Sequence, residues 1–138
     1  MKLSLDEDSV KALVVYRLQH AKDTFAEVKS LTESGFYNTA VNRLYYACYY
    51  AVIGLLVKHN IPTQTHAGVK QMLGLHFVTT KKLEPENARF YAQMFNNRIS
   101  GDYDDFVTFD LEMIEELIPQ TELFIDAIEK LIEETNLK

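Results

Sequence analysis

The stretch that decides the fold is AVNRLYYACYYAVIGLLV, residues 40–57. Wound into a helix, it is apolar or aromatic nearly all round, which is the pattern of a helix buried at the centre of a fold. Its apolar run, Tyr45–Val57, is rich in tyrosine and too short to span a bilayer. The sequence therefore predicts a buried core helix over about residues 36–59 rather than a membrane span.

Small side chains recur along this stretch at helical spacing. Ala40, Ala47, Ala51 and Gly54 fall on one stripe, where a neighbouring helix can come close. The helix should end at Asn60-Ile61-Pro62, because the residue before a proline resists helical dihedral angles.

Four further helices are predicted by apolar residues at spacings of three and four. The first is expected to be capped by Ser4, Asp6 or Asp8 and to end at Gly35. A glycine, Gly101, should stop the fourth helix, and Pro119 should kink or split the last. The expected ranges are about 8–33, 65–77, 85–100 and 110–134.

The connections between these segments are short, which favours antiparallel neighbours. No internal repeat, low-complexity tract or domain boundary is visible along the chain. The prediction is thus a single all-α domain over residues 1–138, an antiparallel bundle of four long helices plus one short helix.

Charge and composition exclude several classes of protein. The 138 residues carry 14 Lys and Arg against 20 Asp and Glu, for a net charge of −6, and 14 of the acidic residues lie in residues 70–138. The basic surface expected of a duplex-DNA binder is missing. The single cysteine, Cys48, and the absence of an apolar signal in MKLSLDEDSV predict a cytoplasmic protein.

The familiar chemical motifs are absent as well. The sequence has no glycine-rich phosphate loop, and its four histidines have no metal-ligand spacing. The acidic run at residues 102–105 fails as a calcium loop, because Val107 and Met113 stand where glycine and the closing glutamate are needed. No metal and no cofactor are predicted.

Two stretches remain as candidate sites. In residues 42–50, Arg43 lies within an apolar helix, so its guanidinium must be ion-paired or must line a wet cleft. In residues 96–103, Arg98 and Asp102 are one helical turn apart, which allows an ion pair. The alternative there is a phosphate site, with donors from Arg98 and from the amide of Asn97. His66 is interpreted as a helix-start or packing residue.

These segments together resemble the HEPN-domain family. The resemblance rests on AVNRLYYA at residues 40–47, THAGV at 65–69 and RISGDYDDF at 98–106, and it covers about residues 8–132. It is to the small stand-alone prokaryotic branch of the family. It implies a HEPN-like bundle, similar to nucleotidyltransferase substrate-binding subunits, that forms a homodimer and is paired with a minimal nucleotidyltransferase in a toxin–antitoxin-like system.

Active members of the family are metal-independent RNA endonucleases in which an arginine is followed, after four to six residues, by a histidine. Arg98 matches that arginine, but the window after it holds Tyr103, Asp104 and Asp105 and no histidine. The resemblance therefore implies binding of RNA or nucleotide. No membrane partner is expected. The residues expected to bind are Arg43, Asn42, Tyr46, Asn97 and Arg98.

Two alternatives stay open. The first is a divergent endoribonuclease in which Asp102 or Tyr103 works with Arg98 in place of the missing histidine. The second is a non-catalytic protein-interaction module, which the net charge and the missing histidine favour.

Overall fold

The computed structural model describes residues 6–103 and 108–134, with the side chains of residues 100–103 left out. Every element in this part of the chain is helical, which confirms the all-α prediction. The elements are α1 (Glu7–Glu33), α2 (Tyr37–Lys58), α3 (His66–Leu73), the π-helical turn η1 (Gly74–Val78), α4 (Pro85–Tyr103) and α5 (Leu111–Glu134).

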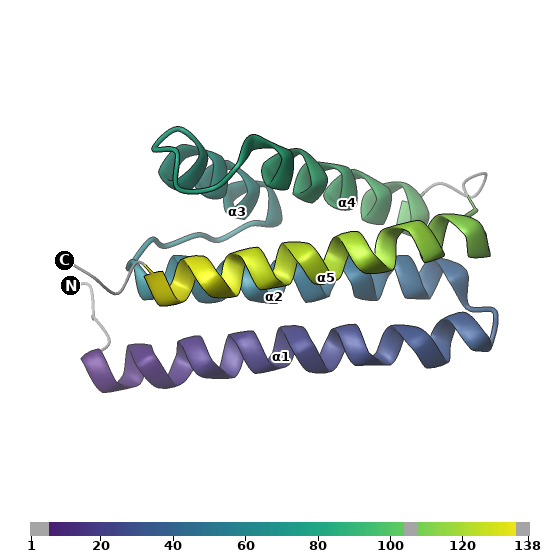
Figure 1. Cartoon of the computed structure of the whole chain (residues 1–138), viewed down its shortest axis with the longest axis horizontal. Helices are drawn as coiled ribbons and strands as arrows, with labels where there is room; N and C mark the ends of the chain where they lie inside the picture. Colours follow the sequence, from purple (N-terminus) through teal and green to yellow (C-terminus); the bar gives the residue numbers. More distant parts are fainter. Residues whose placement is uncertain (1–5, 104–107, 135–138) are drawn as a thin grey trace.

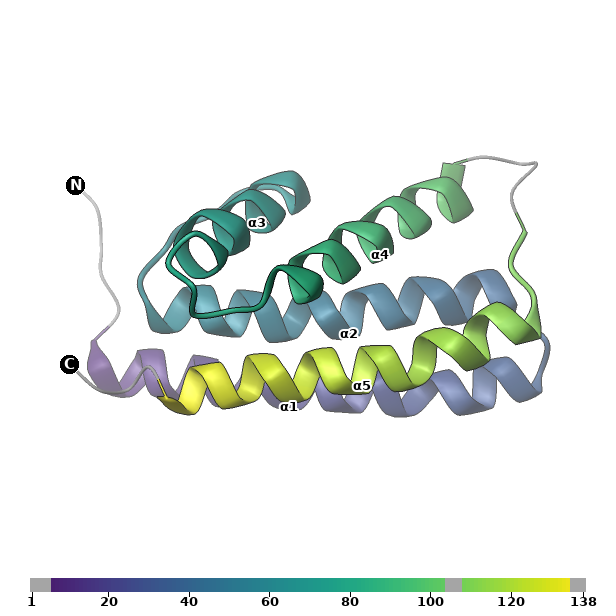
Figure 2. The same ribbon diagram turned by 45° about the horizontal axis from the view of Figure 1, so that its top comes forward.

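The four long helices form a bundle around α2. Successive long helices alternate in direction, as the antiparallel prediction requires (Figure 1). Helices α3 and α4 lie on one side of α2, with α1 and α5 on the other (Figure 2). The connection after α2 doubles back along that helix, so that α3 begins over its middle. The start of α3 is thereby brought beside α2 and α4.

Helix α2 is the core of the bundle. Ala40, Ala47 and Ala51 are fully buried, and a Cβ added at Gly54 would lie 3.2 Å from the Cβ of Arg17 in α1. The predicted small-residue stripe is therefore the line along which α1 and α2 pack closely. Helix α2 is long and apolar enough to cross a membrane, but 61% of that window is buried inside this fold, as befits a core helix.

The helix ends follow the expected local chemistry. The carboxylate of Asp6 accepts a hydrogen bond from the Ser9 amide at 2.7 Å and caps α1. Gly35 has φ +82°, a conformation that favours glycine, and it reverses the chain into α2. Asn60 has φ 57° and ends α2 two residues before Pro62.

One expectation about the helices is wrong, and two hold only in part. Helix α4 runs through Gly101 to Tyr103, because one glycine costs a helix only about 1 kcal/mol. Helix α5 is continuous through Pro119 and so is not split, and the alternative, a kink at that residue, stays a prediction; Pro119 is exposed, so water can satisfy the carbonyl that loses its donor. The expected helix over residues 65–77 is present as α3 followed by the π turn η1.

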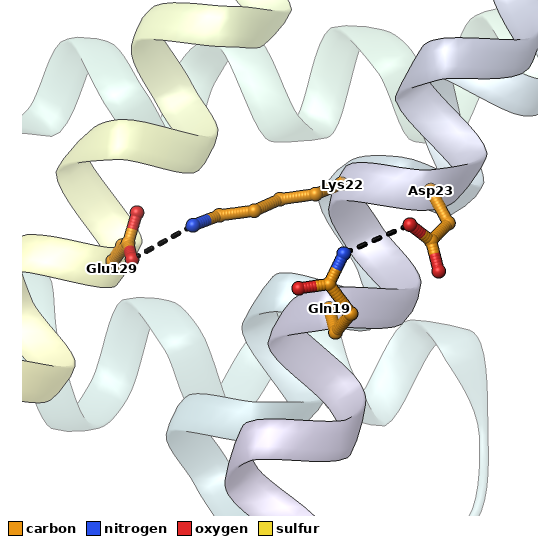
Figure 3. A network of polar contacts seen from close by, with 4 residues as sticks. All are labelled: Gln19, Lys22, Asp23 and Glu129. Carbon is orange, nitrogen blue, oxygen red and sulfur yellow. Dashed lines mark hydrogen bonds and ion pairs between the residues drawn. The ribbon is translucent and has the colours of Figure 1, made fainter.

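A polar contact joins α1 to α5 outside the core (Figure 3). The ammonium of Lys22 lies 2.9 Å from a carboxylate oxygen of Glu129, and Gln19 donates to Asp23 within α1. The Lys22 side chain is 45% exposed, so this ion pair adds little to stability.

Candidate functional site: a cluster of tyrosines, histidine and arginine

The site is built around the ring of Tyr45, where α2, α3 and α4 meet. Tyr45 is fully buried, and its hydroxyl shares a hydrogen bond of 2.8 Å with Nδ1 of His66, the first residue of α3. The guanidinium carbon of Arg98, on α4, lies 5.3 Å from the centre of the Tyr45 ring and 6.0 Å from that of Phe95. The imidazole of His66 and the guanidinium of Arg98 therefore both lie against the side chain of Tyr45.

Two half-buried tyrosines widen this arrangement. Tyr49 stacks on His66 with 4.4 Å between ring centres, and Tyr46 meets His66 edge to face at 5.6 Å. The guanidinium carbon of Arg43 lies 5.0 Å from the centre of the Tyr46 ring. We call the group Arg43, Tyr45, Tyr46, Tyr49, His66 and Arg98 the tyrosine cluster.

Burial keeps the central groups of the cluster neutral. It raises the pKa of Tyr45 to about 12, so the phenol does not ionise at neutral pH. Burial also lowers the pKa of His66 from its ordinary value near 6.5, and the positive charge of Arg98 lowers it further. The imidazole is therefore neutral at pH 7, with one nitrogen engaged by Tyr45.

The cluster contains three of the site residues predicted from the sequence, Arg43, Tyr46 and Arg98. Arg43 and Arg98 lie over the neighbouring rings of Tyr46 and Tyr45, whose centres are 5.2 Å apart. Arg43 also donates two hydrogen bonds, of 3.3 and 3.0 Å, to the side-chain oxygen of Asn42. It makes no ion pair with any residue that the structure describes, so the expected structural ion pair of Arg43 is not found there.

The other predicted residues are not joined to the cluster. Asn97 is half-buried on α4, and no hydrogen bond or ring contact links it to the cluster within the described parts of the chain. The side chains of Asp102 and Tyr103, and the acidic residues 104 and 105, lie outside the described residues.

Sequence reasoning missed His66, Tyr45 and Tyr49 as site residues. His66 does start a helix, as expected, with the hydroxyl of Thr65 accepting from the Gly68 amide at 2.9 Å. What the sequence did not show is that the connection after α2 folds back and sets this histidine against Tyr45. The THAGV segment was noted as part of the resemblance, and that was the available signal.

A helical bundle with a cationic and aromatic cluster between its second, third and fourth helices defines the class of this protein. The family model described as "HEPN domain" matches residues 14–131, and the chain belongs to the HEPN-domain family.

Three relatives of this chain match it over nearly their whole length. It is 37% identical over 122 residues to a UPF0332 protein of Thermotoga maritima, which covers 88% of this chain and 92% of that protein. Two proteins of Methanocaldococcus jannaschii are named "Putative toxin MJ0605" and "Putative toxin MJ0142". The first is 31% identical to this chain, and the match covers 97% of this chain and 98% of that protein. The second is 28% identical, and the match covers 99% of this chain and 93% of that protein. The chain is thus a small HEPN-domain protein that is similar over nearly its whole length to two proteins named as putative toxins.

Proposed function

We propose that this protein binds RNA or nucleotide at the tyrosine cluster, with Arg98 as the main phosphate ligand. The observation that carries the proposal is the placement of Arg98 and Arg43 over adjacent tyrosine rings beside a neutral histidine. A guanidinium presents a planar fork of donors that matches a phosphate, and aromatic rings stack on bases of any sequence. Both kinds of group meet here, in a chain that is acidic as a whole.

The same proposal includes the protein's partners. We infer that the chain acts as a homodimer and as the toxin-like half of a pair with a nucleotidyltransferase in the cytoplasm. Membership of the HEPN family and the toxin names of two relatives support this role. Coexpression with the nucleotidyltransferase from a neighbouring reading frame, followed by size-exclusion chromatography, tests both associations.

The binding site is tested by Arg98→Met, measured by fluorescence anisotropy with a labelled RNA oligonucleotide and with ATP as competitor. Loss of a charged hydrogen-bond donor should weaken binding about tenfold or more. The matched control is Arg89→Met, which removes the same charge from a side chain that is 72% exposed on the same helix. Equal affinity of the Arg98→Met variant and the wild type would show that the site lies elsewhere.

A specific observation also favours metal-independent RNA cleavage. The sequence suggested Asp102 or Tyr103 as the general base in place of the family's histidine. In the structure, the ring of His66 contacts the ring of Tyr45, and the guanidinium of Arg98 lies over that same ring. In this scheme neutral His66 takes the proton of a ribose 2′-hydroxyl, and Arg98 neutralises the adjacent phosphate. The 2′-oxygen bonds to phosphorus as the bond to the 5′-oxygen breaks, the departing 5′-oxygen takes a proton from water, and the other product is a 2′,3′-cyclic phosphate. Cleavage of a labelled RNA should be lost in both His66→Gln and Arg98→Met, and equal cleavage by all three proteins would reveal a contaminant.

A further inference from the structure

We propose that the binding site continues from the tyrosine cluster across α2 to α1, where Arg17 and His20 of α1, together with Tyr50 of α2, form a second subsite for single-stranded RNA several nucleotides long. This proposal rests on the proposed function, because it extends the same site. It assigns a role to residues of α1 that neither the resemblance nor the candidate stretches included.

The first support is an unbroken series of ring contacts. From Tyr49 the series passes to Tyr50, with 5.8 Å between ring centres. The imidazole of His20, on α1, then stacks on Tyr50 at 3.8 Å with only 13° between the ring planes. Tyr16 follows at 5.7 Å from His20 and is 57% exposed. Aromatic groups therefore run from α4 and α3, over α2, to the outer surface of α1.

The second support is the state of the two polar side chains on α1. The Nε atom of Arg17 and the Nδ1 atom of His20 are buried, and neither has a hydrogen-bond partner among the described residues. An unsatisfied buried polar atom is costly, and a bound ligand or water offsets that cost. Both residues are only half-buried, so each side chain also reaches solvent. The guanidinium of Arg17 is a donor suited to phosphate oxygens, and the Nδ1 atom of His20 donates or accepts according to the tautomer of the ring.

The third support is charge. The guanidinium of Arg17 is close enough to Tyr49 to lower the pKa of that phenol, although burial, the larger effect, raises it. Lys70, on α3, lies 4.6 Å from the centre of the Phe95 ring, beside Arg98. Cations thus accompany the rings at both ends, as expected of a surface that follows a nucleic-acid backbone.

The length of this surface favours a strand over a mononucleotide. Arg17 packs against Gly54, which lies nine residues beyond Tyr45, about 14 Å along the axis of an α-helix. Successive phosphates of one strand are about 3.4 Å apart along its axis, so a surface of this length has room for a strand of several nucleotides. A single strand is required because the rings must meet base faces, which a duplex covers.

The experiment compares AMP, a single-stranded RNA 8-mer and the same 8-mer as a duplex. For the wild type we expect tighter binding of the single strand than of either AMP or the duplex. Arg17→Met should weaken binding of the single-stranded 8-mer about tenfold, as expected for the loss of a charged hydrogen bond. The slope of log affinity against log salt concentration should fall by about one, as expected for the loss of one phosphate contact. The affinity of this variant for AMP should stay within about twofold of the wild-type value.

Tyr16→Ser is a second variant, at an exposed residue. It should weaken binding of the single-stranded 8-mer and leave binding of AMP and of the duplex unchanged.

Arg89→Met and Val15→Ser are the matched controls, since both side chains are exposed and lie outside the series of rings. If the Arg17 and Tyr16 variants bind the 8-mer like these controls, the second subsite is refuted. If Arg98→Met weakens AMP binding in that case, the proposed function still stands. If Arg98→Met changes nothing either, both proposals fail.

Discussion

Two faces of helix α2 differ in what they do. The face formed by Ala40, Ala47, Ala51 and Gly54 is closed, with small side chains that let α1 approach to contact. The face formed by Tyr46, Tyr49 and Tyr50 is only half-buried, and it is covered by the rings of His20 from α1 and His66 from α3 and by Arg43 of α2 itself. We infer that one helix serves both to hold the bundle together and to present the site.

The difference shows how a helix at the centre of the core can also present binding residues. A tyrosine buries a large apolar ring, and its hydroxyl still requires a partner. Tyr45 finds that partner in His66, while its ring contributes to packing. Stability and binding should therefore respond to different substitutions. Three measurements of unfolding test the stability side of this comparison, and the binding measurements on the Arg98 and Arg17 variants test the other.

The largest effect is expected on the closed side of α2. Leu44 is fully buried in the core cluster, so Leu44→Ala should lower the free energy of unfolding by about 2–5 kcal/mol through lost burial and the cavity left behind. Urea unfolding followed by circular dichroism measures it. A loss below about 1 kcal/mol would mean that the core relaxes around the missing atoms.

A smaller effect is expected from Tyr45→Phe, which keeps the ring and removes the hydroxyl. The bond to His66 is lost, and we expect a destabilisation of about 1 kcal/mol. Tyr37→Phe is the control, because no hydrogen bond of the Tyr37 hydroxyl is seen in the described structure. Equal unfolding energies for the two variants would show that the Tyr45–His66 bond is energetically neutral.

The smallest effect concerns pH. Because burial and Arg98 lower the pKa of His66 in the folded state, the unfolded chain takes up a proton first as the pH falls. This contribution to stability is complete above about pH 6.5, the pKa of an unperturbed histidine, and is lost as the pH falls through the lower, folded-state value. Thermal unfolding between pH 7.5 and 5 should show a steeper loss in the wild type than in His66→Asn. The exposed His76 provides the control substitution, His76→Asn, which should keep the wild-type slope.

Much of the fold was predictable because it depends on local patterns. The spacing of apolar residues gave four long helices within a few residues of their observed ends, and Gly35 and Asn60 reverse the chain where turn chemistry requires it. The expected stop at Gly101 is wrong, because a single glycine was treated as enough to end a helix. A helix that is well packed on one side can continue through a glycine, and α5 is likewise not split at Pro119.

The site was only partly predictable, since it depends on contacts distant in sequence. Arg43, Tyr46 and Arg98 stood out as residues whose chemistry was unusual for their position. His66 lies 32 residues before Arg98, and no spacing rule links the two. Their meeting depends on the returning connection before α3, and periodicity does not report the path of a connection.

The bond between Tyr45 and His66 also fixes what the imidazole can do. It occupies Nδ1, so only Nε2 is available to a ligand. If the phenol donates, the neutral ring carries its hydrogen on Nε2 and acts as a donor to an anion; in the other tautomer, Nε2 is a proton acceptor. The direction of the Tyr45–His66 hydrogen bond therefore decides between anchoring a ligand and abstracting a proton, and ¹⁵N chemical shifts of the ring distinguish the two states.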